Sequence, residues 1–321
     1  MTMKTTSISI VVPVFNEEWA IDPFYGKLER ALAGYQDCEV IFVDDGSTDR
    51  TIDRLLDLSR EHLSLKVIKL RRNFGVTHAL QAGIDHARGD CIVTISGNLQ
   101  DEPAEIPKLL KLIDEGFDVV VGWSQSEDGE LTRESTSGFS SWLISKISGV
   151  QLHDYNCLLR AYRSELLKGL QLYANLERYI PVYIFWKGGT IAETPVLQHP
   201  RSHGKRARVS KTKRTLKTIL DLFMLKFLEK FSDRPLYIFG ALSLGSFAFG
   251  LLSLSWMIWL KIFQGKAFIE TPLPLVTVLF ILTGVLLMVL GVMAEFLARV
   301  YLSGRNEPIY AIAQISEPEA K

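Results

Sequence analysis

The chain has 321 residues, enough for one full-sized domain with additional elements, and its 36 basic and 36 acidic residues give a formal net charge of zero. This balance lacks the strongly basic character of nucleic-acid-binding domains, so we expect no nucleic-acid partner. The three cysteines, Cys38, Cys91 and Cys157, have neither a CxxC pair nor zinc-ligand spacing, which predicts free thiols in a reducing compartment.

The N-terminal stretch has a short, β-branched apolar run that ends without a small-residue cleavage site. This pattern is not typical of a signal peptide, so we expect the first two thirds of the chain to stay in the cytoplasm. Short β-branched runs then alternate with amphipathic segments. The predicted strands are 8–15, 38–45, 66–70, 91–96 and 118–123, and the predicted helices are 17–34, 48–63, 75–89 and 103–116. This order predicts an α/β domain over 1–200, with a mostly parallel sheet and helices on both faces.

Polar residues follow three of the predicted strands: Asn16 and Glu17, then Asp44 and Asp45, then Ser96 to Asp101. Ligands of parallel sheets bind beyond the carboxyl ends of the strands, so these residues mark the expected site. The run Asp44 to Asp49 also fits a helix N-cap, with a Gly46 turn and a capping hydroxyl. Capping does not explain two adjacent acids, which could accept hydrogen bonds from a nucleobase or a ribose.

Two uncharged stretches, about 236–260 and 272–294, are each long enough to cross a membrane as a helix. Buried helices of a soluble protein are the alternative, but two such stretches in tandem favour a membrane hairpin within 236–302. The basic flank before the first stretch, and Arg299 and Arg305 after the second, predict that both flanks and both termini are cytoplasmic. We therefore expect a multi-pass protein of the inner, or cytoplasmic, membrane, with 303–321 as a cytoplasmic tail.

A basic block at 201–214 precedes the first stretch, and apolar residues recur at helical spacing from Leu216 to Phe231. We expect 201–235 to form a basic juxtamembrane region whose amphipathic helices lie in the headgroup layer. A solvated basic surface and a core-facing soluble helix are the alternatives.

The motifs VVPVFNEE, VDDGSTD, RRNFG, LQDEPAEIP and HDYNCLLRAYR, in this order and spacing, resemble family 2 glycosyltransferases of the GT-A, Rossmann-like type. Within that family the chain resembles the polyprenyl-phosphate glycosyltransferases: dolichyl-phosphate-mannose synthase, prophage-type glucosyl transferases and undecaprenyl-phosphate 4-deoxy-4-formamido-arabinose transferase. The resemblance implies a nucleotide-sugar donor, UDP- or GDP-linked, a polyprenyl phosphate acceptor, and possible assembly as a homotetramer. The implied donor-binding residues are Pro13, Phe15, Glu17, Asp44, Asp45, Asn73 and Gly75. Core packing is the alternative for Phe15.

The chain departs from the family pattern after the fourth strand. The family typically has Asp-Ala-Asp-Leu-Gln, whose acids hold Mg²⁺ or Mn²⁺ against the donor diphosphate, whereas this chain has Ser96-Gly97-Asn98-Leu99-Gln100. Asn98 and Gln100 retain neutral oxygens, so the resemblance implies a weakened metal site, with Asp101 as a candidate substitute ligand.

The resemblance places Asp154 and Arg160 in an acceptor-side loop. We expect Asp154 to act in positioning and electrostatics, with general-base work as a lesser option. A local cap or a salt bridge between Asp154 and Arg160 is the structural alternative. Further basic residues could bind a lipid phosphate or the donor diphosphate, each with a solvated surface as its alternative. These residues are Arg133, Arg201, Lys205 and Arg206.

The sequence therefore predicts inverting transfer of a sugar from a nucleotide to a polyprenyl phosphate at the cytoplasmic membrane face. The missing acids keep a second function open, in which a catalytically degenerate relative binds nucleotide or lipid as a membrane partner. A processive polysaccharide synthase is less consistent with the sequence, because the Gln-x-x-Arg-Trp signature and further spans are absent.

Overall fold

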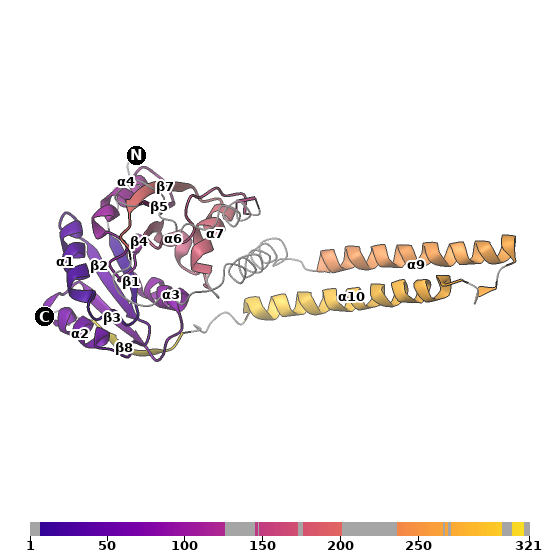
Figure 1. The fold of residues 1–321 in the computed structure, drawn as a ribbon, viewed down its shortest axis with the longest axis horizontal. Coiled ribbons are helices and arrows are strands. Elements are labelled where there is room, and N and C mark those ends of the chain that lie inside the picture. Colours follow the sequence, from indigo (N-terminus) through magenta and orange to yellow (C-terminus); the bar gives the residue numbers. More distant parts are fainter. Residues whose placement is uncertain are drawn as a thin grey trace. The chain divides into compact units, whose positions relative to one another are not determined.

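The structure is a computed structural model that describes residues 7–125, 145–146, 148–172, 176–200, 236–265, 267–268, 271–303 and 310–317. The chain divides into two compact units. Met1–Thr215 and Pro308–Lys321 form the first unit, and Leu216–Glu307 form the second. In Figure 1 the first unit is a sheet with helices packed against it, and the second contains two long helices.

One eight-stranded sheet organises the first unit, in the order β7-β5-β6-β4-β1-β2-β3-β8. The strands are β1 (Ile8–Val14), β2 (Cys38–Asp44), β3 (Leu65–Leu70), β4 (Cys91–Thr94), β5 (Val119–Gln125), β6 (Arg160–Arg163), β7 (Ile191–Leu197) and β8 (Ile312–Ser316). β1 pairs in parallel with β2 and β4, β2 with β3, and β5 with β7. β6 runs antiparallel to β4 and β5, and β8 runs antiparallel to β3.

Helices cover both faces of this sheet. They are α1 (Ile21–Leu32), α2 (Thr51–Glu61), α3 (Val76–His86), η1 (Pro103–Glu105), α4 (Ile106–Asp114), α6 (Ser164–Leu167), η2 (Leu176–Tyr179) and α7 (Ile180–Trp186). One set of alternating β1 side chains packs in a core with residues of α1, α2 and α4. α3 packs on the opposite face, where a Cβ on Gly83 would come within 2.2 Å of Val11. β1 is buried along its whole length because both faces are covered.

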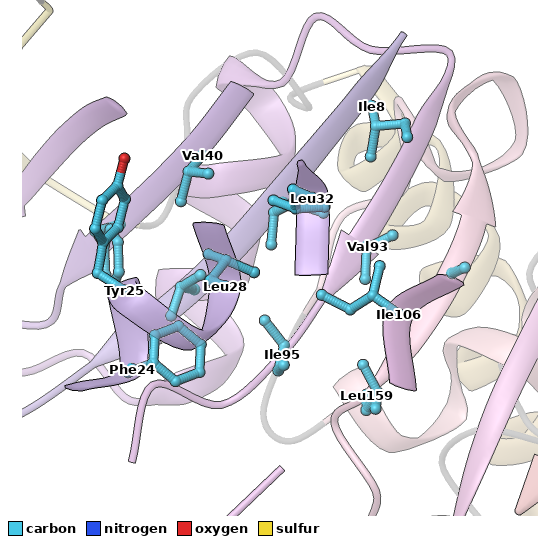
Figure 2. Packing of buried hydrophobic residues seen from close by; sticks show 14 of the residues in the cluster. Ile8, Phe24, Tyr25, Leu28, Leu32, Val40, Val93, Ile95, Ile106 and Leu159 are labelled. Carbon is cyan, nitrogen blue, oxygen red and sulfur yellow. The ribbon is translucent and has the colours of Figure 1, made fainter. Parts of the chain in front are cut away.

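α1 shows how a sequence pattern becomes packing. Its buried side chains recur every three or four residues, which places them on one helical face. Figure 2 shows Leu28 and Leu32 of this face near Val40 of the sheet, in a cluster that also contains Phe24 and Ile8. The ring of Phe24 meets that of Phe42 edge-on, with centroids 6.1 Å apart.

The second unit contains α9 (Leu236–Gln264) and α10 (Leu273–Ser303). Phe239–Gln264 and Leu273–Leu297 are long and apolar enough to cross a membrane, and only 17 % of each span's most apolar window is buried. Such exposed apolar helices are unlike the core helices of soluble proteins. The two helices meet through small residues: the Ser243 hydroxyl donates to the Gly284 carbonyl (2.8 Å), and the Ser246 hydroxyl to that of Phe280 (2.7 Å).

The predicted fold class is confirmed. All five predicted strands and all four predicted helices of the first domain are present. β6, β7 and β8 were not predicted. The expected tail at 303–321 contains β8, which lies at the edge of the sheet beside β3. The expected juxtamembrane region at 201–235 lies outside the described residues.

Candidate active site

The carboxyl ends of the parallel strands β1, β2, β4 and β5 meet at one edge of the sheet, which also receives the start of the antiparallel β6. We call this the site edge. It gathers the loops that follow Val14, Asp44, Leu70 and Thr94, together with the loop that precedes Arg160. The predicted site residues of the described chain therefore lie on loops at the site edge or at the adjoining strand ends.

The loops after β1 and β2 are joined by hydrogen bonds. Asn16 adopts a positive φ of 54°, and its side-chain oxygen accepts from the Thr48 amide (2.8 Å). The main-chain amide of Asn16 donates to the Ser47 hydroxyl (2.9 Å), and the main-chain amide of Glu17 donates to Thr51 Oγ1 (2.9 Å). The capping alternative is thus only partly right. Ser47 and the Thr48 amide fasten the neighbouring loop, while the first turn of α2 bonds to Asp49, whose carboxylate accepts from the Thr51 amide at 3.0 Å.

Asp45 fastens the loop Arg71–Gly75, which we call the donor loop. Its two carboxylate oxygens accept from the amides of Phe74 (2.7 Å) and Gly75 (2.9 Å). Burial raises the pKa of Asp45, and these hydrogen bonds offset part of that rise. Gly46 makes the close approach possible: its φ is +70°, and a Cβ there would lie 2.4 Å from the Arg72 carbonyl carbon.

Asp44, the last residue of β2, is completely buried. Its Oδ1 accepts from the Ser47 amide at 3.2 Å, and its Oδ2 has no hydrogen-bond partner within the described part of the chain. Burial raises the pKa of the Asp44 carboxyl. Asp44 thus holds the turn at Ser47 through one oxygen, and its expected role in donor binding stays a prediction.

The other expected donor residues differ in exposure. Phe15 is 41 % exposed, so it is not part of the core, and its ring is free to stack on a flat ligand. Asn73 is also exposed, whereas Pro13 and Glu17 are buried. Beside Asn73, the guanidinium of Arg72 lies 4.1 Å from the ring centroid of Phe74. Arg72 is an exposed cation on the donor loop that the sequence analysis did not single out.

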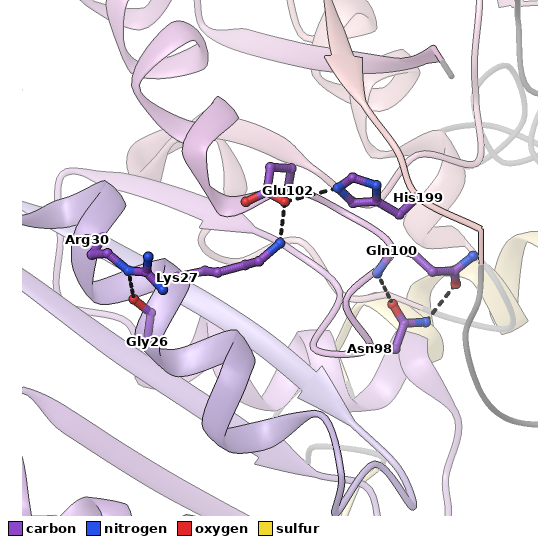
Figure 3. Close-up of polar contacts among 7 residues, drawn as sticks. All are labelled: Gly26, Lys27, Arg30, Asn98, Gln100, Glu102 and His199. Carbon is purple, nitrogen blue, oxygen red and sulfur yellow. Dashed lines mark hydrogen bonds and ion pairs between the residues drawn. The ribbon is translucent and has the colours of Figure 1, made fainter. Parts of the chain in front are cut away.

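The loop Ser96–Asp101 has its own hydrogen bonds. Leu99 adopts a positive φ of 61°, which brings Asn98 and Gln100 together. The Asn98 amide nitrogen donates to the Gln100 side-chain oxygen (2.7 Å), and the Gln100 main-chain amide donates back to Asn98 Oδ1 (3.1 Å). Figure 3 shows these two side chains facing each other. The Asn98 and Gln100 side chains are thus joined by hydrogen bonds within the loop.

Asp101 is almost completely buried, and both of its carboxylate oxygens are occupied. Oδ2 accepts from the Ser96 amide (3.2 Å) and Oδ1 from the Gln198 side chain (3.0 Å). Burial raises its pKa. Both oxygens of Asp101 thus bond to neighbouring segments, and its role as a substitute metal ligand stays a prediction. Among the described residues, no group of three His, Cys, Asp or Glu side chains could hold a metal ion. The donor set present here, two amides, is a poor fit to Mg²⁺ or Mn²⁺.

The segment after β7 is tied to this loop. The His199 amide donates to the Gln100 carbonyl (2.8 Å). The His199 ring lies 3.1 Å from Glu102 Oε2, and Lys27 reaches the same oxygen at 2.6 Å (Figure 3). Burial would raise the pKa of Glu102, but the hydrogen bonds from Lys27 and His199 outweigh it and lower that pKa. None of these three residues was predicted, because their pairing joins segments far apart in the chain.

Asp154 on the acceptor-side loop is buried, and both carboxylate oxygens accept hydrogen bonds. The Ser124 hydroxyl donates to Oδ2 (2.8 Å), and the Asn156 amide donates to Oδ1 (2.7 Å). Ser124 is the last residue but one of β5 and was not predicted. Its bond fixes the Asp154 carboxylate at the site edge, so a local cap is part of the role of Asp154.

Arg160 at the start of β6 is 1 % exposed, and its role in catalysis stays a prediction. Its guanidinium donates to the carbonyls of Glu177 (2.7 Å) and Tyr155 (2.8 Å). Arg160 therefore joins the acceptor-side loop at Tyr155 to η2 at Glu177, and these carbonyls are its partners where the structural alternative was a salt bridge to Asp154. The remaining predicted cations, Arg133, Arg201, Lys205 and Arg206, lie outside the described residues.

A mostly parallel sheet with its donor loop fastened at the carboxyl edge is the GT-A architecture of nucleotide-sugar-dependent glycosyltransferases. Glucosyl-3-phosphoglycerate synthase from Mycobacterium tuberculosis, solved with Mn²⁺, UDP-glucose and glycerol 3-phosphate, has a similar fold. Its TM-score is 0.53 at 21 % identity, over 68 % of this chain and 80 % of that one. Residues 9–170 match glycosyl transferase family 2, and the chain belongs to this family.

Two curated relatives match nearly the whole chain, including the two apolar helices. The chain is 36 % identical to dodecaprenyl-phosphate galacturonate synthase of Rhizobium johnstonii, over 99 % of this chain and 96 % of the relative. It is 31 % identical to undecaprenyl-phosphate 4-deoxy-4-formamido-L-arabinose transferase of Edwardsiella ictaluri, over 96 % of this chain and 94 % of the relative. The predicted family is confirmed.

Proposed function

We propose that the chain transfers a sugar from a nucleotide sugar to a polyprenyl phosphate at the cytoplasmic face of a membrane. One observation carries this proposal: similarity to two polyprenyl-phosphate sugar transferases extends through the catalytic domain and both candidate spans. A degenerate binding protein is less consistent with this similarity, because both relatives are named as enzymes.

The donor is proposed to be a UDP-sugar. Structures with a similar fold contain UDP and UDP-glucose. The exposed Phe15 ring offers a stacking surface for the base, and the exposed Arg72 a charge for the diphosphate. The relative with 36 % identity is named for galacturonate, so a UDP-linked hexuronate is the first donor to test.

The proposed reaction is one in-line displacement with inversion. An oxygen of the lipid phosphate attacks the anomeric carbon, and the bond from that carbon to the UDP oxygen breaks. UDP leaves with the bonding electrons. A phosphate monoester has a second pKa near ~6, so the acceptor is already largely ionised at neutral pH and needs no strong base. Asp154, held by Ser124 and the Asn156 amide, therefore serves to orient the acceptor and shape the local field.

Negative charge that develops on UDP is proposed to be balanced mainly by basic residues. The carbonyl of Gln100 is bonded to His199, and the basic block at 201–214 begins two residues after His199 in the sequence. This connection supports the assignment of Arg201, Lys205 and Arg206 to phosphate binding, with Arg133 as a further candidate. Any Mg²⁺ or Mn²⁺ would be held chiefly by the donor diphosphate, because Asn98 and Gln100 offer only neutral oxygens.

We also propose that the two spans form a hairpin whose flanks are both cytoplasmic. The first unit contains the segments that precede and follow the spans in the sequence, and β8 is hydrogen-bonded into the same sheet as β1 to β7. A sheet folded on one side of a membrane requires both flanks on that side. A reporter fused at Lys321 should be active only in the cytoplasm; activity only outside it contradicts this topology. Assembly as a homotetramer stays a proposal from family resemblance.

The test of the transferase function uses purified protein in detergent, undecaprenyl phosphate, and UDP-linked galacturonate, glucose and formamido-arabinose. Turnover of at least one donor, dependent on the lipid phosphate, is the expected result. The matched control is Asp154→Asn, which keeps the shape of the site and removes its charge. Donor binding without turnover for every sugar would favour the binding-protein function.

A further inference from the structure

The C-terminal strand β8 reaches the donor loop. β3 ends at Leu70, directly before the loop Arg71–Gly75, and β8 pairs beside it with Leu70 opposite Ile312. The register shifts between Lys69 and Leu70, so the pairing is irregular where the loop begins. β8 therefore borders the donor loop as well as the sheet.

Two hydrogen bonds extend this pairing into the loop. The Arg71 amide donates to the Ala311 carbonyl (2.9 Å), and Arg71 Nε donates to the Ile312 carbonyl (3.4 Å). The first residue of the donor loop is thus held by residues some 240 positions away in the sequence. The far end of the loop is held by Asp45, through Phe74 and Gly75.

Tyr310 adds a contact with the helix that follows the donor loop. Its side chain is 7 % exposed, and its hydroxyl donates to Asp85 Oδ2 in α3 at 2.8 Å. Asp85 Oδ1 accepts from Gln81, whose own oxygen accepts from the Leu172 amide (2.8 Å). The segment 310–312 thus contacts the entry of the donor loop and the last turn of α3, the helix that follows the loop.

We propose that Tyr310 and β8 are positioning elements of the donor site: they hold the loop Arg71–Gly75 in the conformation that binds the nucleotide. The inference rests on the proposed function for the identity of the ligand, a nucleoside diphosphate. Enzymes lose as much as ~10²-fold in rate when a site shifts by about 1 Å, so loosening this loop should weaken donor binding measurably.

The strand offers a matched control at its other end. Glu317 lies at the opposite edge of the sheet, where it pairs with Lys66 at 2.6 Å and Arg88 at 3.5 Å. Glu317→Gln removes the charge of these ion pairs but leaves Tyr310 and the donor loop untouched. Tyr310→Phe removes only the hydroxyl, and Tyr310→Ala removes the packing as well.

Equilibrium binding of UDP and amide hydrogen exchange of residues 71–75 test the proposal without requiring turnover. Tyr310→Ala should weaken UDP binding about tenfold and speed amide exchange of Phe74 and Gly75, with a smaller effect in Tyr310→Phe and none in Glu317→Gln. In turnover assays the KM for the donor should rise and that for the lipid should not. If Tyr310→Ala does not fold, Tyr310→Phe decides by the exchange rates.

Unchanged UDP affinity and unchanged exchange in a folded Tyr310 variant overturn the proposal. An equal rise of both KM values also overturns it, because a general loss of structure affects both substrates. If the wild-type chain shows no transfer to any lipid, the proposed function fails while the UDP and exchange measurements still decide the role of β8.

Discussion

Gly46→Ala should disrupt the donor loop far more than an ordinary glycine substitution. Gly46 has a φ of +70°, and a Cβ there would lie 2.4 Å from the carbonyl carbon and 2.7 Å from the Cα of Arg72. Both atoms belong to the backbone, so no side-chain rotation relieves the clash. The loop must move away, and it then loses the hydrogen bonds from Phe74 and Gly75 to Asp45.

The expected destabilisation by Gly46→Ala has two parts, a backbone cost and the loss of two hydrogen bonds. Left-handed backbone costs a residue with a Cβ about 1–2 kcal/mol. Each hydrogen bond to a charged group contributes about 1.5–3 kcal/mol, so losing both bonds to Asp45 adds about 3–6 kcal/mol. Gly169→Ala is the matched control, because Gly169 has a φ of +80° and no atom within 4 Å of the added Cβ. Gly169→Ala should therefore show only the cost of the left-handed backbone.

Apparent melting temperature and UDP affinity, both measured in detergent, separate these parts. One kcal/mol corresponds to about 2–4 °C for a domain of this size, so Gly169→Ala should melt about 2–8 °C below wild type. Gly46→Ala should melt at least about 6 °C lower still and bind UDP poorly. If both variants melt together and Gly46→Ala binds UDP as wild type does, the close approach to Arg72 is not what requires glycine.

Asp154→Asn should reduce turnover by about 10²-fold or more with little change in melting temperature, because the amide can still accept from Asn156 and donate to a rotated Ser124 hydroxyl; near-normal turnover would leave Asp154 only its capping role. Ser96→Asp combined with Asn98→Asp should raise Mn²⁺ affinity in calorimetric titrations with UDP, since carboxylates are stronger ligands than hydroxyl and amide; equal affinity in both forms refutes the loss of metal ligands. Glu102→Gln should lower stability by about 1–2 kcal/mol at pH 7. The folded pKa of Glu102 is depressed, so this contribution is present above the unfolded pKa of about 4.3 and is lost as pH falls through the folded value; a pH-independent difference in melting contradicts it.

The sequence predicted the central sheet because strands buried on both faces are continuous apolar runs, as in β1. It did not predict β6, which is only four residues long and carries two arginines. It also did not predict β8, whose middle residues are exposed at the sheet edge. The stability of β8 comes from pairing with β3, a contact between distant segments that local periodicity does not encode.

The motifs bring the expected residues of the described chain to the carboxyl edge of the sheet, but the sequence alone did not predict their hydrogen-bond partners. The two acids of the Asp44-Asp45 motif were both expected to face the donor. In the structure Asp44 is buried and bonded to the Ser47 amide, and Asp45 is bonded to the backbone of the loop Arg71–Gly75. Arg160 was expected to act in catalysis and holds main-chain carbonyls. A sequence gives the charge of a side chain, whereas its partners depend on how the loops pack.

The measurement that tests the central claim most directly is identification of both products from one reaction with UDP-sugar and polyprenyl phosphate. The account predicts a polyprenyl monophosphate carrying one sugar, released together with UDP in equal amounts, with the anomeric configuration inverted. Release of UMP with a polyprenyl diphosphate sugar would mean that the phosphate, and not the anomeric carbon, is attacked. That result, or a product with retained configuration, would contradict the in-line displacement proposed here.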